Sequence, residues 1–264
     1  MEKIIYRKEN EKLFCQYWEE LSQKKQAGPR YLLLTLDYQL AIARGKNLLV
    51  DDQSFIFLVD NKPIAAVFLP IEQDSSGKCI TSSGDYAAAP LFLADQAQKE
   101  VFGMIDEIAK KLKVVKIKLA IDPLENENYN FLQKYDYLDS SILSYLFDLT
   151  NEDFLRACRR GHRCDIKKLL ADKNFKVFYI DAANPLYDIH EECRELHRKC
   201  SGRITRAKES FDLQFEKLKQ GQAVLFGLKY KEQTVCFNIL LACSESLLGS
   251  LSQTEEQSWL AIFR

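Results

Sequence analysis

The stretch that decides the fold is SYLFDLTNEDFLRACRRGHRCDIKKLLADKNFKVFYID, residues 144–181. Its two ends, SYLFDL and FKVFYID, are rich in the aromatic and branched side chains that favour strands. The segment between them spaces its apolar residues as a helix does. We interpret the stretch as the last strand of one domain, a connecting helix, and the first strand of a second domain.

The connecting helix is strongly basic. Thr150 and Asp153 resemble a capping box at its start. Its apolar residues form one stripe, namely Leu155, Cys158, His162, Ile166 and Leu169. It contains only one acidic residue beyond its start, Asp165, and six basic residues, namely Arg156, Arg159, Arg160, Arg163, Lys167 and Lys168. Gly161 weakens the helix by roughly 0.5–1 kcal/mol relative to alanine, so the helix is expected to bend or pack closely there. The basic face is either a solvated surface or a wall for a phosphate-bearing ligand, because arginine forks match phosphate oxygens.

The composition predicts a globular protein without a membrane span. The chain has 264 residues, of which 47% are hydrophobic and 28% charged, and its net charge is -1. No apolar run approaches the ~20 residues that a membrane helix needs. The N-terminal sequence MEKIIYRKENEK lacks an apolar signal core, so we expect a cytoplasmic location. The 8 cysteines form no CxxC pair, which predicts reduced core thiols rather than a zinc site or a disulfide framework.

The order of the predicted elements repeats along the chain. The first part contains strand 3–7, helices 11–25 and 31–44, strands 54–59, 63–71 and 78–82, helix 95–112, strand 114–121, helix 125–135 and strand 142–149. The second part contains strand 175–181, helices 185–199 and 209–220, and strands 223–230, 234–242 and 247–251. The order β-α-α-β-β-β-α-β-α-β thus begins again, and after six elements SQTEEQSWLAIFR resembles the start of the next helix, so only the final β-α-β is missing. We expect a first domain at 1–149, a connecting basic helix at 150–172 and a partial second domain at 173–264.

This order resembles the GNAT acyl-CoA N-acyltransferase fold, and two copies joined by a basic helix resemble the FemAB-type family. Arg163-Cys164-Asp165-Ile166-Lys167-Lys168 is similar to that family's interdomain helix. Leu196-His197, Gly202-Arg203, Thr205-Arg206 and Asp212-Leu213-Gln214 resemble a second run found in a branch of the family. The expected fold class is therefore α+β, with two GNAT-like domains in tandem and the second incomplete at its C-terminal end.

The resemblance implies acyl transfer to an amine. The donor would be an acyl-CoA or an aminoacyl-tRNA, and the acceptor a nucleotide-linked sugar or a cell-envelope precursor. Catalysis in this class rests on positioning, oxyanion stabilisation and removal of a proton from the amine. The resemblance implies no metal ion as cofactor.

The sequence departs from the GNAT pattern at the donor site. GNAT enzymes carry a glycine-rich loop whose backbone cradles the donor's pyrophosphate at a helix N-terminus. The first copy offers only Ser83-Gly84-Asp85-Tyr86, and the second offers Ser252-Gln253-Thr254-Glu255-Glu256, whose acids would repel phosphate. The missing C-terminal elements would also leave a strand edge open in the second domain, which favours self-association.

Eight residues are the candidates for function. Arg159 and Arg163 on the basic helix, with Arg203 and Arg206 in a helix–helix connection, would bind an anionic substrate. Asp85 and Tyr86 would line a substrate cleft, although an ordinary turn explains them equally well. His197 and Asp212 are the candidate general bases. The competing interpretations are a hydrogen-bonded structural histidine and a carboxylate that caps its helix.

A non-catalytic module is the alternative function. It would retain the GNAT-like fold for binding or assembly after loss of the donor site. The missing pyrophosphate loop and the missing C-terminal elements favour it, and fold alone does not decide between the two functions.

Overall fold

The computed structural model describes residues 2–122, 130–140, 154–243 and 246–249. Within it the chain forms two compact units, residues 1–141 with 206–213 and residues 142–205 with 214–264. The boundary expected at residue 149, the strand 142–149 and the capping box at Thr150 lie outside the described residues. The α+β class expected from the sequence is confirmed, because both units contain helices together with sheets whose strands are mostly antiparallel.

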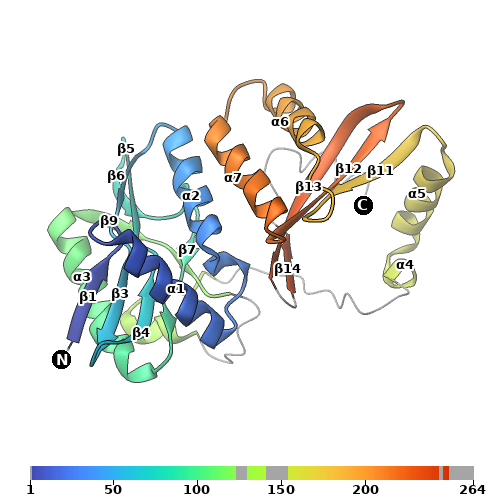
Figure 1. Cartoon of the computed structure of the whole chain (residues 1–264). Helices are drawn as coiled ribbons and strands as arrows, with labels where there is room; N and C mark the ends of the chain where they lie inside the picture. The colour runs from blue at the N-terminus through green and yellow to red at the C-terminus, as the bar shows by residue number, and fades with distance from the viewer. Residues whose placement is uncertain (1, 123–129, 141–153, 244–245, 250–264) are drawn as a thin grey trace. The chain divides into compact units, whose positions relative to one another are not determined.

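The first unit opens with a strand, two helices and a long two-stranded ribbon (Figure 1). The elements are β1 (Glu2–Tyr6), α1 (Glu11–Lys25), a 3₁₀ turn (Pro29–Tyr31), α2 (Leu33–Gly45), β2 (Leu49–Asp52), β3 (Phe55–Val59), β4 (Lys62–Val67) and β5 (Pro70–Asp74). They continue with β6 (Gly77–Ile80), β7 (Ala87–Ala88), β8 (Leu91–Phe92), a 3₁₀ turn (Asp95–Ala97), α3 (Gln98–Leu112), β9 (Val114–Ile117), β10 (Leu119–Ala120) and a 3₁₀ helix (Phe131–Tyr135).

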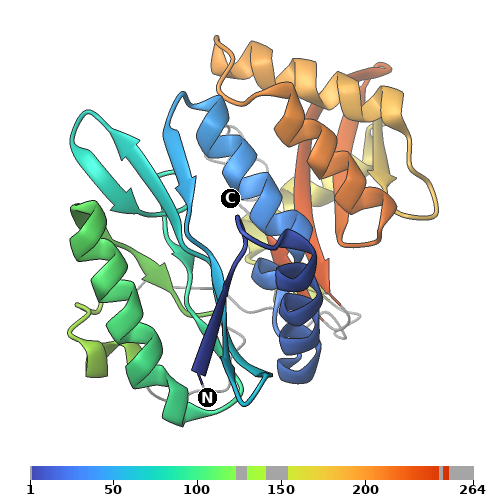
Figure 2. The same cartoon turned by 60° about the vertical axis from the view of Figure 1, so that its left-hand side comes forward.

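Two four-stranded sheets and one short pair organise these strands. The orders are β1-β3-β4-β8 and β2-β5-β6-β9, and β7 pairs with β10. All pairs are antiparallel except β6 with β9 and β7 with β10, which are parallel. Figure 2 shows α3 on one side of these strands and α1 and α2 on the other. The sheets are therefore sandwiched between helices, and the strand interiors supply the core of this unit.

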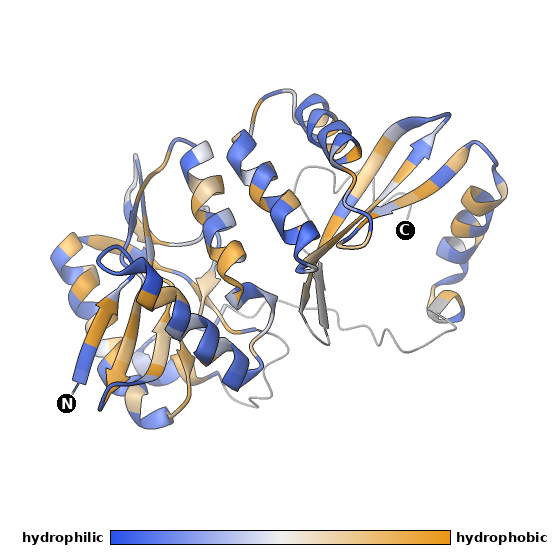
Figure 3. Cartoon of the chain, viewed as in Figure 1, coloured by the Kyte–Doolittle hydropathy of each residue, from blue (hydrophilic) through white to orange (hydrophobic). Residues whose placement is uncertain are grey.

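Helix α1 shows how the sequence pattern becomes packing. The Asn10 side chain accepts a hydrogen bond from Leu13 N at 3.1 Å, which caps the helix as polar side chains do at N-termini. The apolar stripe then buries Phe14, Trp18 and Leu21. Trp18 Nε1 donates to Tyr31 O at 2.5 Å, so the buried indole N–H is satisfied. In Figure 3 the strands of this unit are predominantly hydrophobic, whereas α1 is largely hydrophilic on its visible side.

The prediction of a single strand at 63–71 is wrong, because the chain bends between β4 in one sheet and β5 in the other. Residues 68–69 separate β4 from β5, and residues 53–54 separate β2 from β3 at the same level. Gln53 N donates to Leu69 O at 3.0 Å, and Leu69 N donates to the hydroxyl of Ser54 at 2.9 Å. The Ser54 hydroxyl in turn donates to Asp52. At the bend, the Ser54 hydroxyl takes the place of a backbone carbonyl as the acceptor for Leu69 N. The backbone groups therefore remain hydrogen-bonded where the chain passes from one sheet to the other.

Two further expectations in this unit need correction. The strand expected at 114–121 is divided into β9 and β10 at Lys118. The helix expected at 125–135 is a 3₁₀ helix over its described part, capped by Asn130, whose side chain accepts from Leu132 N at 3.1 Å. Strand β2 and the two-residue strands β7 and β8 lack the length or alternation that would predict them.

The second unit begins with two helices and continues with a strand, two helices and three strands. Its elements are α4 (Phe154–Ala157), α5 (Arg160–Ala171), β11 (Phe175–Ile180), α6 (Tyr187–Ser201), α7 (Lys208–Lys219), β12 (Ala223–Tyr230), β13 (Gln233–Cys243) and β14 (Ser246–Gly249). The sheet order is β11-β12-β13-β14, antiparallel throughout. The core of this unit contains Ile180, Cys193, Leu218, Leu225 and Ile239. Helix α7 begins in residues assigned to the first unit and ends in the second.

One face of the second sheet is left partly open. Successive side chains of β11 point to opposite faces of the sheet. Ile180 is buried on the core face, whereas Val177 and Tyr179 lie on the opposite face and are 60% and 53% exposed. Tyr179 pairs in register with Phe226 of β12, which is also exposed. Among the described strands, β11 and β14 form the edges of this sheet.

The uninterrupted basic helix expected at 150–172 is wrong within its described part. Helices α4 and α5 are separated at Cys158 and Arg159, and Arg159 has extended dihedral angles, φ -57° and ψ 148°. Arg163 Nη1 donates to Arg156 O at 3.1 Å, which bonds a carbonyl near the end of α4. Gly161 lies inside α5, so the break occurs two residues before the glycine where a bend was expected.

The two units share a pairing pattern as well as an element order. In the first unit β1 pairs with β3, which pairs with β4. In the second unit β11 pairs with β12, which pairs with β13. In each case two helices lie between the first two of these strands, and every pair is antiparallel, but the first unit has the additional strand β2 before β3.

Candidate functional site

The most constrained surface feature of the first unit is a loop that interrupts a strand. Strands β6 and β7 pair parallel with β9 and β10, and Lys118 lies between β9 and β10. Lys118 N donates to Ile80 O at 2.9 Å, and Ala87 N donates to Lys118 O at 3.0 Å. Lys118 therefore bonds the end of β6 and the start of β7, and residues 81–86 between these two strands lie outside the sheet. We call residues 81–86 the excursion loop.

The excursion loop is a tight two-residue turn. Ser82 and Asp85 exchange both backbone hydrogen bonds at 3.0 Å, and the residues between them have positive φ, 56° at Ser83 and 85° at Gly84. Two central residues with positive φ are the signature of a type I′ turn, which favours glycine at the second position. Ser83 adopts the left-handed conformation without being glycine, so surrounding contacts must stabilise it.

Glu72 of β5 provides those contacts. Glu72 is buried, with 4% of the residue's surface exposed. One carboxylate oxygen accepts from Thr81 Oγ1 at 2.6 Å and from Gly84 N at 2.8 Å, and the other accepts from Ser83 N. The Glu72 carboxylate thus accepts hydrogen bonds from both amide donors of the turn.

Two lysines bind the carbonyl side of the same turn. Lys46 Nζ donates to Ser83 O, and Lys118 Nζ donates to Gly84 O, each at 2.9 Å. Lys118 Nζ also lies 5.7 Å from the centroid of the Tyr86 ring, within cation–π range. Both central residues of the turn, Ser83 and Gly84, therefore have their N–H and C=O groups hydrogen-bonded.

Asp85 and Tyr86, the candidates from the sequence, lie together on this loop. Asp85 is exposed, and its carboxylate accepts from Tyr86 N at 2.9 Å. Tyr86 is half-buried, and its hydroxyl lies 2.9 Å from the hydroxyl of Ser140. The sequence missed Glu72, Lys46 and Lys118, which are distant along the chain and carry no local motif.

His197 and Asp212 belong to separate compact units, so no geometry between them follows. His197 lies on α6 and is buried, at 5% exposure. Asp212 is about half-exposed, and its carboxylate accepts from Lys208 Nζ at 2.7 Å, one helical turn earlier. This ion pair explains Asp212 without catalysis, as i,i+4 pairs commonly do on helices.

The second unit buries an unexpected number of polar side chains between α6 and α7. His190, Gln214 and Lys217 are each at most 2% exposed. His190 Nε2 lies 3.3 Å from Gln214 Oε1, and the His190 ring lies 5.2 Å from the ring of Phe215. His190 and His197 of α6 are both buried in the structure. Buried polar groups of this kind specify how two helices pack.

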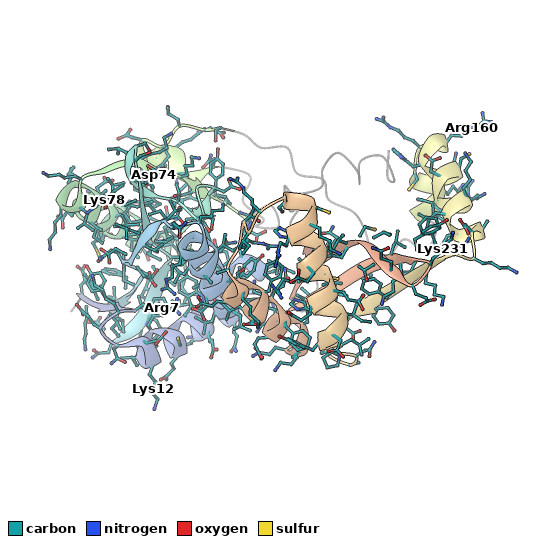
Figure 4. All side chains as sticks on the ribbon, turned by 90° about the horizontal axis from the view of Figure 1, so that it is seen from above. Arg7, Lys12, Asp74, Lys78, Arg160 and Lys231 are labelled. Carbon is teal, nitrogen blue, oxygen red and sulfur yellow. The ribbon has the colours of Figure 1, made fainter. Side chains whose placement is uncertain are left out.

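Arg159 and Arg163 lie where α4 ends and α5 begins. Arg159 is exposed at the start of α5, while Arg163 is half-buried against Arg156 O. Arg160 lies at the outer end of α5 (Figure 4). Helix α5 buries none of its residues. Residues 154–176 contain eight lysines and arginines against two acids, so this segment is a solvated cationic surface.

The predicted pair Arg203 and Arg206 is divided between the two units. Arg203 is exposed in the second unit. Arg206 packs within the first unit, where Nη1 donates to the hydroxyl of Tyr38 at 2.5 Å and the guanidinium lies 4.5 Å from the Phe211 ring. Arg44 and Glu209 approach to 4.0 Å nearby. Residues 206–213 therefore fasten to α2 of the first unit.

A second charged cluster is structural. Arg7 is buried and contacts Glu11 at 3.3 Å, Asp52 at 3.6 Å and Asp37. Burial lowers the pKa of Arg7, but the hydrogen bond and charge of Asp37 outweigh it, so the net pKa is raised. Arg7 lies among the packed side chains of the first unit (Figure 4). The cluster ties β1 to α2 and β2.

Within the described ranges, no three His, Cys, Asp or Glu side chains are grouped closely enough to hold a metal ion. None of the helices that the structure describes is long and apolar enough to cross a membrane. The expectation of core thiols holds for Cys193 and Cys236, which are buried, but is wrong for Cys164 and Cys200, which are exposed. No protein-family model and no curated protein matches the chain.

Proposed function

We propose that the protein is an N-acyltransferase of the tandem GNAT-like, FemAB-like type. It would transfer an acyl or aminoacyl group, from an acyl-CoA or an aminoacyl-tRNA, to an amine of a nucleotide-linked sugar or envelope precursor in the cytoplasm. The observation that supports this function is the shared pattern of the two units, in which two helices separate strands that pair antiparallel in the same order. This pattern is the one that the resemblance implies for each copy.

Three of the proposed substrate contacts, Asp85, Arg159 and Arg203, are exposed, and the other three, Tyr86, Arg163 and Arg206, are half-buried. Asp85 and Tyr86 would meet the acceptor at the excursion loop, and Arg159, Arg163, Arg203 and Arg206 would meet anionic groups of donor or acceptor. Of the two candidate bases, Asp212 is the more accessible to a substrate amine, since His197 is buried. We propose that Asp212 removes the proton from the substrate amine.

The tRNA-dependent variant is supported by the basic segment. Helix α5 presents exposed cations without burying any of its own residues. A surface that neutralises phosphates with lysine and arginine releases counterions, so tRNA binding should weaken steeply as salt increases. Loss of that salt dependence in Arg160→Glu and Lys168→Glu variants would support this donor.

A non-catalytic binding module is the second candidate, and one specific observation favours it. The amide donors of Ser83 and Gly84 are engaged by Glu72. In GNAT enzymes the amides of such a loop bind the donor pyrophosphate, whereas here both amides bind the Glu72 carboxylate.

A thermal-shift titration separates the candidates. The ligands are acetyl-CoA, longer acyl-CoAs and UDP-sugars, applied to the full chain. Ligand at 100 times its Kd stabilises the folded state by roughly 2.7 kcal/mol, which is a readily visible shift. A CoA-specific shift supports acyl-CoA-dependent transfer, and a shift with UDP-sugar alone supports the aminoacyl-tRNA variant. No shift with any of these ligands supports the binding module.

A further inference from the structure

We propose that the protein forms a two-fold dimer in which strand β11 of one copy pairs antiparallel with β11 of a second copy. The two strands would cross the symmetry axis at Val177, so that the four-stranded sheets of both copies become one continuous sheet. The proposal concerns assembly alone and does not rest on acyl transfer. It applies to a transferase and to a binding module alike.

The backbone of β11 determines which of its groups face away from β12. Lys231 N donates to Asn174 O at 3.0 Å, one position before Phe175, where the ladder with β12 begins. In an antiparallel ladder, hydrogen-bonded and non-hydrogen-bonded positions alternate along the strand. Val177 and Tyr179 lie an odd number of residues after Asn174, so their backbone N–H and C=O groups point away from β12.

These outward groups are available for pairing. Among the described residues, no hydrogen bond engages the backbone of Val177 or Tyr179 on that side. Phe175 N donates to Asp172 O at 3.0 Å, so this end of the strand offers its carbonyl alone. The side chains of Val177 and Tyr179 are exposed as well. An edge strand with unpaired backbone groups and exposed apolar side chains is a template for pairing with another chain.

Strand β11 lacks the features that usually protect an edge. Proteins block edge strands with proline, with β-bulges or with charged side chains, lysine above all. The sequence of β11, FKVFYI, contains no proline or glycine, and its register with β12 is unbroken. Its one charged residue, Lys176, forms an ion pair with Glu232 of the same copy. The edge is therefore open to a partner strand.

A second copy of β11 fits this edge. A two-fold axis at Val177 places residues that are equally distant from Val177 opposite each other. Val177 then lies opposite Val177 of the other copy, and Phe175 lies opposite Tyr179, on the exposed face of the sheet. The N–H of Val177 would donate to the C=O of Val177 in the other copy, and the N–H of Tyr179 to the C=O of Phe175. Aromatic and β-branched cross-strand pairs of this kind stabilise sheets.

The charges at the two ends of β11 select this register. Lys173 lies four residues before Val177, and Asp181 lies four residues after it. The axis therefore brings Lys173, which is exposed, beside Asp181 of the other copy, and the same contact recurs at the other end. Moving the axis by one residue would separate these opposite charges. Because the arrangement uses β11 of both copies, assembly closes at the dimer.

The test is sedimentation velocity over a concentration series of the full chain, with the charge-reversed variants Lys173→Glu and Asp181→Lys. Each variant alone places like charges opposite each other at both ends of the strand pair, so its self-association should weaken by about tenfold. An equimolar mixture of the two variants restores opposite charges at both ends of a mixed dimer. Its association should return to within about twofold of the wild-type Kd.

Lys231→Glu is the matched control for charge reversal. Lys231 is an exposed lysine in the turn between β12 and β13 of the same unit, away from the outward edge of β11. This variant should change the dimer Kd by less than about twofold.

Val177→Pro tests the backbone pairing. Because the Val177 N–H points away from β12, proline removes the intermolecular donor without removing a hydrogen bond of the sheet. We expect this variant to remain monomeric with an unchanged circular dichroism spectrum.

A wild-type protein that stays monomeric as its concentration increases overturns the proposal, as does assembly that continues beyond the dimer. A mixture of the charge variants that associates no better than either variant alone overturns it too. If Asp181→Lys fails to fold, Lys173→Glu and Val177→Pro decide, and wild-type association in both of them overturns the proposal.

Discussion

Glu72 and Gly84, twelve residues apart, are joined by a hydrogen bond of 2.8 Å from the Gly84 amide to the Glu72 carboxylate. Together with the bonds from Thr81 and Ser83, this contact fixes an exposed loop to a buried anion in the adjacent strand. The loop that the GNAT resemblance would assign to donor phosphate is therefore satisfied from inside the protein. The amides of Ser83 and Gly84 are therefore engaged within the protein and do not face a ligand.

Replacing Glu72 should be costly. Glu72→Ala leaves three buried or half-buried donors without their acceptor, and we expect a loss of about 2–4 kcal/mol in the free energy of unfolding. Glu72→Gln retains one acceptor oxygen but directs an N–H group toward other N–H groups, so a loss of about 1–3 kcal/mol is expected. Urea denaturation measures both. Stability within about 0.5 kcal/mol of wild type in either variant would contradict the role assigned to Glu72.

Gly45 permits the close contact between α2 and residues 206–213. A Cβ atom added at Gly45 would lie 2.7 Å from Ala207 N, a backbone atom that cannot rotate away. Gly45→Ala should release residues 206–213, which limited proteolysis at Arg206 and Lys208 would detect as faster cleavage.

Gly103 is the matched control for that substitution. It lies inside α3, and nothing lies within 4 Å of an added Cβ. Gly103→Ala should therefore stabilise the protein by about 0.5–1 kcal/mol through helix propensity, with unchanged cleavage at residues 206–213. Equal behaviour of the two alanine variants would show that the contact between Gly45 and Ala207 does not hold the segment.

Ser54 should be required for the bend between the two sheets of the first unit. Its hydroxyl accepts from Leu69 N at 2.9 Å and donates to Asp52. Ser54→Ala leaves the buried Leu69 amide without its acceptor, with an expected loss of about 1–3 kcal/mol. Ser76→Ala removes a similar hydroxyl from an exposed turn at Asp74 and should change stability by less than about 0.5 kcal/mol. Similar denaturation midpoints for the two variants would refute this account of the bend.

Glu192 should contribute to stability in a pH-dependent way. Its pKa is lowered, first by the hydrogen bond from Thr234 and then by Lys229, against an opposing effect of burial. A carboxylate with a depressed folded-state pKa stabilises the fold above its unfolded pKa of about 4.3, and this contribution is lost as pH falls through the folded pKa. Because Glu192 is about half-exposed, solvent screening keeps the effect below about 1 kcal/mol.

Thr234→Val tests this relationship. The difference in unfolding free energy between pH 7 and pH 3 should be smaller in Thr234→Val than in the wild-type protein. An identical difference in the two proteins would show that Thr234 does not control the titration of Glu192.

Self-association through the second sheet is the remaining prediction. Val177 and Tyr179 lie on the edge strand β11 and expose apolar surface. If copies associate there, sedimentation velocity should show concentration-dependent oligomers that Val177→Lys reduces. Leu49→Lys, on the exposed strand β2, is the control and should leave association unchanged. A monomer at all concentrations, or equal effects of both variants, would contradict this interface.

The sequence predicted long elements better than the site. Helix α1 matches its prediction from Glu11 to Lys25, since a cap and an apolar stripe define it locally. The bend at Ser54 and Leu69 and the division of the strand at Lys118 were missed, because their causes are contacts between residues far apart in the chain. Asp85 and Tyr86 were predicted from their place after a strand, and both lie on the excursion loop. Glu72 was not, because an acidic residue within a strand indicates nothing about the loop that it binds.

The most direct test of the account is amide hydrogen exchange at Ser83 and Gly84, measured by NMR in the wild-type protein and in Glu72→Gln. If Glu72 holds both amides, they should exchange at least 100-fold more slowly in the wild-type protein than in an unstructured loop. That protection should be largely lost in Glu72→Gln, while the amide of Trp18 in the core of the unit stays protected. Exchange at unprotected rates in the wild-type protein would contradict the central claim that a buried carboxylate fixes this loop.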